Sequence, residues 1–481
     1  MGSHAFAHCE NLAAISLPDG IVSIEDSVFY ECENLSSISF PNGLTSISEH
    51  AFYNCDSLIT LSLPDGLESI GESAFESCEG LTSISLPTSL TTLKREAFND
   101  CEALTAIVIP NGITSIEVRT FYNCTQLTSC SFPDSLISIE SSAFAYCHRL
   151  ASITLPDEFT TIGDHAFQYC YRLTDISLPD SLTSIGTESF ARCDRLISIS
   201  LPPNLATMGE EAFGSNGRLE SFDVDPLNQH FQSIDDVLFT KPLETLITYP
   251  RGKTDTFYRI PDGVLRIEDH AFAGSSDLNH ILFPDSLTSI GSYAFHYSSK
   301  LTHLSFPSGL TSIESHAFAN CYNLISVSLP ASLTLIGDSA FGPCRKLAAV
   351  FFAGPPPFVG TFSYSFWELS PQARAYILPE HAPSFGNPGA DWQNLTVAFQ
   401  PPILEQIAPK IIDFRLSEST TLIIITGPPN TPYICKHSSD LNTFTEIETA
   451  PSLIQTDSSG TTSFVVEHNG TKGFFSLETI Q

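Results

Sequence analysis

The fold of this chain is decided by a repeated stretch, one copy of which reads Ala74-Phe75-Glu76-Ser77-Cys78-Glu79-Gly80-Leu81-Thr82-Ser83-Ile84-Ser85-Leu86-Pro87. Its phenylalanine recurs with a constant period of 23 along the chain, which makes the stretch one unit of an internal repeat. The period is interrupted once, between Phe213 and Phe272, and then resumes, so that 14 units are found in all. The repeated residues are Phe6, Phe29, Phe52, Phe75, Phe98, Phe121, Phe144, Phe167, Phe190, Phe213, Phe272, Phe295, Phe318 and Phe341.

Each unit contains a short strand pattern. Leu81, Ile84 and Leu86 follow the spacing L-x-x-I-x-L, which is typical of the strand in a leucine-rich repeat. Ile84 and Leu86 alternate with Ser83 and Ser85, so one strand face is apolar and the other carries hydroxyl groups. A proline, which has no N–H for a strand ladder, follows the strand in most units.

A single coil cannot bury its apolar face alone, but stacked coils bury it continuously. The sequence therefore predicts a leucine-rich repeat solenoid with a parallel β-sheet over residues 1–354. With strands ~4.8 Å apart, 14 coils would form a sheet about 65 Å long.

The unit A-F-x-x-C-x-x-L-x-x-I-x-L-P-x-x-L-x-x-I-G resembles the BspA-like class of leucine-rich repeats, found in bacterial surface antigens and adhesins. The resemblance implies a secreted or cell-surface protein that binds other molecules through its solenoid, and it implies no particular ligand. The repeat pattern begins at Gly2-Ser3-His4-Ala5-Phe6, so we expect any export signal and N-terminal cap to lie upstream of Met1.

Two regions depart from the repeat. Within residues 223–262, two short strand patterns read Ser233-Ile234-Asp235-Asp236-Val237-Leu238-Phe239 and Leu246-Ile247-Thr248-Tyr249-Pro250, which resembles a hairpin insertion. We favour an enlarged structural coil there over a dedicated ligand loop. Residues 355–401, with Trp392, resemble a degenerate last coil and cap, because terminal repeats must cover the open core.

Residues 402–481 have a different composition. Short strand patterns separated by Gly, Pro, Asn and Asp predict a small all-β sandwich. The segment 438–444 and the terminal Phe474-Phe475-Ser476-Leu477-Glu478 are similar to fibronectin-like modules of exported bacterial proteins. The resemblance implies a spacer or a partner-binding module.

The charge balance excludes several partners. Acidic residues outnumber basic ones by 54 to 21, and the formal net charge is −33. Such a charge repels phosphate backbones and anionic lipid surfaces, so we expect neither nucleic-acid binding nor membrane insertion. No stretch has the ~18–20 consecutive apolar residues of a transmembrane helix, and no loop resembles a calcium-binding motif.

Most cysteines share one repeat position, three residues after the phenylalanine. Asn216, Ser275 and Ser298 occupy the same position elsewhere, which indicates a small side chain that bonds to the neighbouring coil's backbone. Cβ atoms in stacked coils lie ~4.8 Å apart, beyond the ~3.5–4.5 Å of a disulfide, so we predict buried free thiols. This ladder consists of Cys9, Cys32, Cys55, Cys78, Cys101, Cys124, Cys147, Cys170, Cys193, Cys321 and Cys344.

No catalytic constellation or cofactor motif is found in the sequence. There is no G-x-S-x-G elbow, no phosphate-binding glycine loop and no Cys/His spacing typical of zinc. His280 and His303 stand one repeat apart and could share a metal, but no third ligand is evident. The sequence therefore predicts a non-catalytic protein without a cofactor.

The outward strand face is the candidate binding surface. It is nearly uniform in Ser and Thr in the first coils, and larger groups replace these after the insertion. We predict a ligand-binding site for a protein or a glycan at His280, Leu282, His303 and Phe351, with Phe231 and Tyr249 of the insertion as one wall. The function predicted is extracellular binding or adhesion. The alternative is an accessory or carbohydrate-binding part of a larger secreted enzyme.

Overall fold

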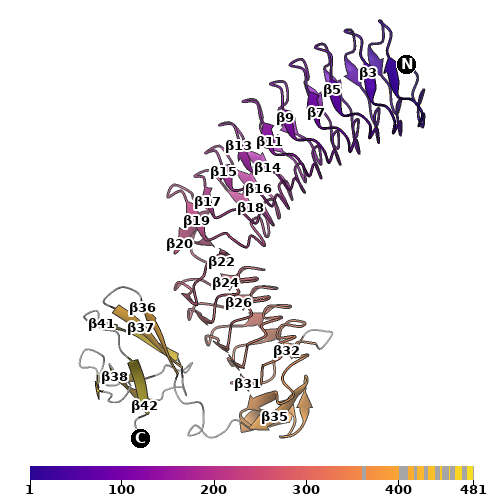
Figure 1. Cartoon of the computed structure of the whole chain (residues 1–481). Helices are drawn as coiled ribbons and strands as arrows, with labels where there is room; N and C mark the ends of the chain where they lie inside the picture. The colour runs from indigo at the N-terminus through magenta and orange to yellow at the C-terminus, as the bar shows by residue number, and fades with distance from the viewer. Residues whose placement is uncertain are drawn as a thin grey trace. The chain divides into compact units, whose positions relative to one another are not determined.

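The computed structural model describes residues 1–359 and 364–399 and, beyond them, the backbones of seven strands between residues 410 and 479. The chain divides into two compact units. Unit 1 comprises Met1–Lys253 and Glu268–Ser275, and unit 2 comprises Thr254–Ile267 and Ser276–Gln481. Each unit contains a stack of narrow coils, which confirms the predicted solenoid (Figure 1).

One side of each coil in unit 1 is a short strand whose middle residue points into the core. Ile84, for example, is buried between the exposed Ser83 and Ser85. Parallel ladders join these strands two by two, with homologous residues side by side, as in Thr60 opposite Ser83. The strands are β1 (Ala14–Ser16), β3 (Ser37–Ser39), β5 (Thr60–Ser62), β7 (Ser83–Ser85), β9 (Ala106–Val108), β11 (Ser129–Ser131), β13 (Ser152–Thr154), β15 (Asp175–Ser177), β17 (Ser198–Leu201) and β19 (Ser221–Val224).

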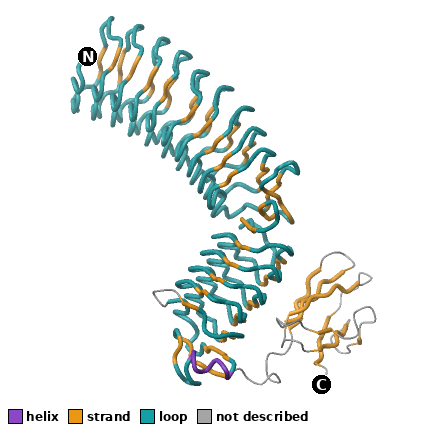
Figure 2. The backbone as a smooth tube through the Cα atoms, turned by 180° about the vertical axis from the view of Figure 1, so that it is seen from behind, coloured by secondary structure: helices purple, strands orange, loops and turns teal. Residues whose placement is uncertain are grey.

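The returning side of each coil carries a two-residue strand that also pairs in parallel with its neighbours. Loops and turns make up most of every coil (Figure 2). The returning strands of unit 1 are β2 (Ser23–Ile24), β4 (Ser46–Ile47), β6 (Ser69–Ile70), β8 (Thr92–Leu93), β10 (Ser115–Ile116), β12 (Ser138–Ile139), β14 (Thr161–Ile162), β16 (Ser184–Ile185) and β18 (Thr207–Met208).

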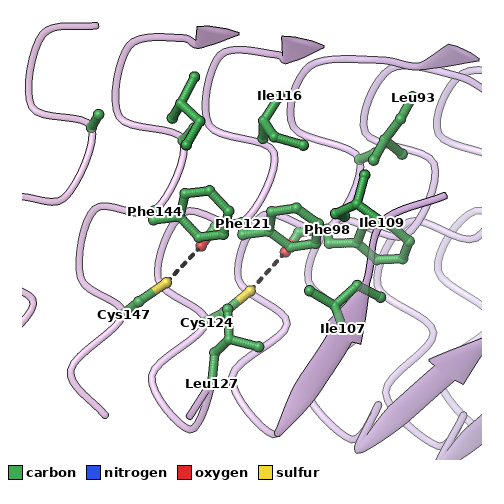
Figure 3. Packing of buried hydrophobic residues seen from close by; sticks show 14 of the residues in the cluster. Leu93, Phe98, Ile107, Ile109, Ile116, Phe121, Cys124, Leu127, Phe144 and Cys147 are labelled. Atoms are coloured by element: carbon green, nitrogen blue, oxygen red, sulfur yellow. Dashed lines mark hydrogen bonds between the residues drawn. The ribbon is translucent and has the colours of Figure 1, made fainter. Parts of the chain in front are cut away.

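The repeated phenylalanines from Phe6 to Phe213 form a continuous stack in the core of unit 1, part of which Figure 3 shows. The ring centroids of Phe121 and Phe144 lie 5.2 Å apart, and those of Phe144 and Phe167 lie 5.5 Å apart. Phe144 is fully buried, and burying such a ring contributes on the order of 1.5–3 kcal/mol. The stack therefore stabilises the contact between every pair of coils.

The insertion in unit 1 is a three-stranded antiparallel meander formed by β20 (Phe231–Ile234), β21 (Val237–Thr240) and β22 (Thr245–Thr248). A buried asparagine, Asn228, anchors its start. The Nδ2 group of Asn228 donates to the carbonyl oxygens of Pro202 (2.8 Å) and Leu205 (3.0 Å). Its Oδ1 atom accepts the backbone N–H groups of His230 and Phe231, each at 2.8 Å.

Regular coils resume in unit 2 with the same two kinds of strand. The outward strands are β23 (Phe257–Arg259), β25 (His280–Leu282), β27 (His303–Ser305), β29 (Ser326–Leu329), β31 (Ala349–Phe352), β33 (Arg374–Ile377) and β35 (Leu395–Phe399). The returning strands are β24 (Arg266–Ile267), β26 (Ser289–Ile290), β28 (Ser312–Ile313), β30 (Leu335–Ile336) and β32 (Phe358–Val359).

Parallel pairing continues from β31 through β33 to β35, so the array extends past residue 354. The ring of Phe366 stacks on that of Phe341 at 5.3 Å and continues the core, although its position departs from the period of the repeat. The described residues contain about 17 turns, more than the 14 units that the spacing predicts. The additional turns do not follow the phenylalanine period in the sequence, because the spacing between coils changes or another residue replaces the phenylalanine.

The end of this array is covered by irregular structure. It contains the 3₁₀-helix η1 (Pro379–His381), the short helix α1 (Ala382–Phe385) and β34 (Asp391–Trp392), which pairs antiparallel with β35. The Trp392 ring packs against Phe352, Phe366 and Phe385. These aromatic contacts shield the last coil from solvent, which is the role expected of a cap.

The strand backbones of the tail form antiparallel sheets. One has the order β36-β37-β41, and the other joins β38 to β39, β40 and β42. The strands are β36 (Lys410–Arg415), β37 (Thr420–Thr426), β38 (Pro432–Ser438), β39 (Thr445–Glu446), β40 (Ile454–Gln455), β41 (Thr461–Glu467) and β42 (Phe474–Thr479). The tail's connections and side chains, that of Cys435 included, lie outside the described residues, so the fibronectin-like module stays a prediction.

Candidate binding surfaces

The two histidines of the predicted site lie on the outward strand face of unit 2, both half-buried. Their strands, β25 and β27, belong to neighbouring coils and contact each other. His280 lies opposite Phe257 in the β23–β25 ladder, and His303 lies opposite Ser326 in the β27–β29 ladder. The Nδ1 atom of His303 lies 2.7 Å from the Ser326 hydroxyl oxygen, which fixes the orientation of the ring.

An aromatic pair occupies the far end of the same strand face. The ring of Phe351 stacks on that of Tyr376 with centroids 4.9 Å apart and 18° between the ring planes. Both rings are half-buried, as is Leu282, which lies opposite Arg259. Tyr376 was not among the predicted site residues, because its spacing from Phe351 is longer than the period of the repeat.

Phe231 and Tyr249 do not form a wall of a binding site, contrary to the expectation from sequence. Phe231 is 8% exposed and Tyr249 is 3% exposed. Tyr249 stands one repeat period before Phe272 and its ring stacks on Phe272 at 5.0 Å, so it takes the place of a phenylalanine in the core. An irregular coil conceals this position in the sequence, because the insertion lies between Phe213 and Tyr249.

The cysteine ladder lies beside the phenylalanine stack (Figure 3). Each buried thiol donates a hydrogen bond to the carbonyl oxygen of the phenylalanine in the preceding coil, as Cys147 does to Phe121 at 3.2 Å. The cysteines within the described residues are free, and those of the ladder after Cys9 are fully buried. Burial raises the pKa of the Cys78 thiol to about 12, so the ladder is chemically quiet at neutral pH.

A second surface, which sequence reasoning missed, lies on the turns of unit 1 that carry the phenylalanines. Aromatic side chains one, two or four residues after the phenylalanine pack against one another across successive coils, and those of Tyr146 and Tyr169 are stacked. Ring centroids are 5.2 Å apart for Tyr122 and Tyr146, 4.5 Å for Tyr146 and Tyr169, and 5.0 Å for His148 and Tyr171. We call these five residues the turn-side row.

Arginines cover two rings of this row. The guanidinium carbon of Arg119 lies 5.5 Å from the ring centroid of Tyr122, and that of Arg192 lies 5.5 Å from the ring of Tyr169. Desolvation lowers the pKa of His148, so its imidazole is neutral at physiological pH. The signal in the sequence is an aromatic residue at the same repeat position in consecutive coils.

Within the part of the chain that the structure describes, no group of three or more His, Cys, Asp or Glu residues could hold a metal ion. Among the same residues, no helix is long and apolar enough to cross a membrane.

The stacked coils and their thiol ladder define a class of protein, the leucine-rich repeat solenoid. The family model of the BspA type leucine-rich repeat region matches residues 1–128, 114–243 and 254–366, and the chain belongs to this family. Its members are repeat proteins of a fold that is typically non-catalytic. No curated protein sequence matches the chain significantly.

Solved structures of bacterial proteins share the fold. A leucine-rich repeat protein from Bacteroides ovatus is 25% identical, with a TM-score of 0.52, over 79% of this chain and 87% of that one. A leucine rich cell surface protein from Faecalibacterium prausnitzii is 26% identical, with a TM-score of 0.51, over 72% of this chain and 92% of that one. The pneumococcal vaccine antigen PcpA, 22% identical with a TM-score of 0.55 over 71% and 89%, shares the fold alone.

Proposed function

We propose that this protein is an extracellular or cell-surface binding protein, active in adhesion, whose solenoid recognises a protein or glycan through its outward strand face. The observation that carries the proposal is the aromatic pair of Phe351 and Tyr376, stacked at 4.9 Å on a face that is otherwise mostly small and polar. Aromatic side chains dominate binding hot spots because they bury a large area at a low cost in conformational entropy.

Two further observations support a site in unit 2. His303 is held by its hydrogen bond to Ser326, and a fixed donor or acceptor is what specific recognition needs. The proposal also agrees with the similarity of this chain to a leucine rich cell surface protein from Faecalibacterium prausnitzii.

An array of extracellular matrix proteins and glycans, probed with the whole chain, tests the function. We expect saturable binding to at least one component. The absence of binding to every component would contradict the proposal.

The site is then tested on the component that binds. We expect the double variant His280→Ala/His303→Ala, and separately Tyr376→Ala, to weaken binding by about tenfold, as hot-spot truncations do. The matched control is Ser83→Ala/Ser131→Ala on the uniform strand face of unit 1. Equal losses from both pairs, or a loss from the serine pair alone, would place the site in unit 1.

A further inference from the structure

Four arginines occupy one repeat position in consecutive coils of unit 1, five residues after the phenylalanine. All four are exposed, and none forms an ion pair with any residue that the structure describes. We call them the arginine column, and they are Arg149, Arg172, Arg195 and Arg218.

Other coils show what this repeat position does for stability. Asn34 donates its Nδ2 group to the carbonyl oxygen of Glu10 in the preceding coil at 2.6 Å. Asn323 does the same to Ser299 at 2.8 Å. The arginines make no such hydrogen bond, so the column gives up a stabilising contact between coils.

Basic residues at the same position in unit 2 behave differently. Lys300 forms an ion pair with Asp277 of the preceding coil. Lys346 donates to the Oδ1 atom of Asn323 at 2.7 Å. A basic side chain at this position is therefore readily paired within the solenoid, and the arginine column is left unpaired in a protein whose net charge is −33.

Placing like charges side by side in successive coils is unfavourable. Homologous residues of adjacent coils lie in register, as the hydrogen bond from the Thr174 N–H to the Ala151 oxygen shows for the coils of Arg149 and Arg172. With coils ~4.8 Å apart, the four positions span about 15 Å. Such an array suits a ligand that carries anionic groups at regular intervals.

The turn-side row lies next to the arginine column in the sequence and stacks in the same coils. Tyr171 immediately precedes Arg172, and it is 38% exposed. Tyr146 and Tyr169 have φ angles of 64° and 62°, a left-handed conformation that is unfavourable for a large side chain. Asn54 and Asn123 occupy this position in other coils, so the tyrosines are not required by the backbone.

We propose that the arginine column and the turn-side row bind a linear anionic polysaccharide, one that carries sulfate or carboxylate groups. A guanidinium group makes paired hydrogen bonds to either oxyanion, and one arginine per coil offers one such contact per sugar residue of an extended chain. The exposed ring of Tyr171 supplies an apolar surface for the C–H groups of a sugar.

The geometry favours a glycan over a nucleic acid. Proteins bind single-stranded nucleic acids through exposed aromatic rings on which the bases stack. Here Tyr146 and Tyr169 stack on each other at 4.5 Å, and Arg192 covers Tyr169, so no base can enter between them.

The test uses the whole chain and titration calorimetry with three probes: a heparin oligosaccharide, an oligogalacturonate and neutral dextran. We expect one or both anionic probes to bind and dextran not to bind. Binding of heparin alone would identify sulfate as the group recognised, and binding of oligogalacturonate alone would identify carboxylate. Absence of binding to both would overturn the proposal.

The variant R149Q/R172Q/R195Q/R218Q should lose about tenfold or more in affinity for the anionic probe and should show a flatter dependence on salt. A matched control, R95Q/R259Q/K300Q/R345Q, removes four charges elsewhere and should change the affinity by less than about twofold, because each of those charges forms an ion pair within the protein. Tyr171→Ala should weaken binding without changing the salt dependence. Equal losses in the two quadruple variants would show a general charge effect and overturn the proposal.

Competition identifies the class of ligand. The proposal would also be overturned if a single-stranded oligonucleotide, or phosphatidylserine vesicles, displaced the anionic glycan at equal charge concentration. The site is independent of the strand face of unit 2: His280→Ala/His303→Ala should leave heparin binding unchanged. If neither anionic probe binds but the chain still binds a component of the protein and glycan array, the anionic-polysaccharide site is wrong and the proposed function still holds.

Discussion

Phe144 and Cys147 represent the two kinds of residue that close the core of each coil. The phenylalanine ring contacts Phe121 and Phe167 face to face and the Phe132 ring edge-on at 5.7 Å. The cysteine fills the adjacent space and donates its thiol hydrogen to the carbonyl oxygen of Phe121, which also accepts the backbone N–H of Cys124 at 3.4 Å. One residue thus supplies apolar area, and the other satisfies the backbone.

Replacing Phe144 with alanine should lower the free energy of unfolding by about 3–5 kcal/mol, because it removes a fully buried ring and leaves a cavity in the stack. Urea denaturation of the two proteins measures the difference. The control Ile137→Ala truncates a side chain that is 48% exposed and should cost less than about 1 kcal/mol. A loss below about 1 kcal/mol for Phe144→Ala would show that the ring does not stabilise the stack.

The ladder thiols should resist alkylation by iodoacetamide in the native protein. At pH 8 a thiol with a pKa of about 12, such as Cys78, is ionised to the extent of only about one part in ten thousand, and it is buried. Cys9, in the first coil, is half-buried and should react first. Mass spectrometry of labelled peptides resolves the two. Rapid labelling of Cys78 without denaturant, or a disulfide between successive ladder residues, would contradict this arrangement.

At the scale of the element, a coil forms many of its backbone hydrogen bonds with the neighbouring coils. The turns carry left-handed residues on both sides of the phenylalanine, such as Ser142 and Tyr146 around Phe144, with φ angles of 56° and 64°. This alternation points the N–H groups of Ser142, Phe144 and Tyr146 all toward the next coil. The insertion lacks this repeated turn, so its backbone groups need other hydrogen-bond partners.

Asn228 supplies such partners, and Asn228→Ala should cost about 2–4 kcal/mol, because four hydrogen bonds of a fully buried amide are lost. Hydrogen exchange should accelerate selectively over residues 229–248. Asn204→Ala provides a matched control, since Asn204 is exposed and makes one bond, to Asp180 at 2.9 Å. Unchanged exchange in the Asn228 variant would show that the meander is held by its own ladder.

At the scale of the whole molecule, the net charge of −33 opposes the compact state through repulsion among the carboxylates. The paired surface charges, such as Lys300 with Asp277, are exposed and contribute little. We therefore expect the melting temperature to rise as NaCl is increased from about 10 mM to about 150 mM, where the Debye length falls to about 8 Å. KCl should have the same effect, because screening depends on ionic strength. A fall in melting temperature would show that attractive pairs dominate.

The outward strand face shows which side-chain positions can be predicted from sequence. The strand alternation places His280, Leu282, His303 and Phe351 at outward positions, and the structure has them half-buried there. Burial cannot be read in the same way from an irregular segment. Phe231 is buried because the meander folds it into the core, which no local pattern indicates.

The sequence by itself determined the repeat, the inward phenylalanines and the free thiols, because a constant period forces homologous side chains of stacked coils into contact. Only the tertiary structure decided which residues outside the recognisable repeats belong to the core. Tyr249 and Phe366 join the stack because coils in register bring them against Phe272 and Phe341, whatever the local pattern of the chain around them. It also decided that the arginine column is unpaired, since pairing depends on which side chains of the adjacent coil lie within reach.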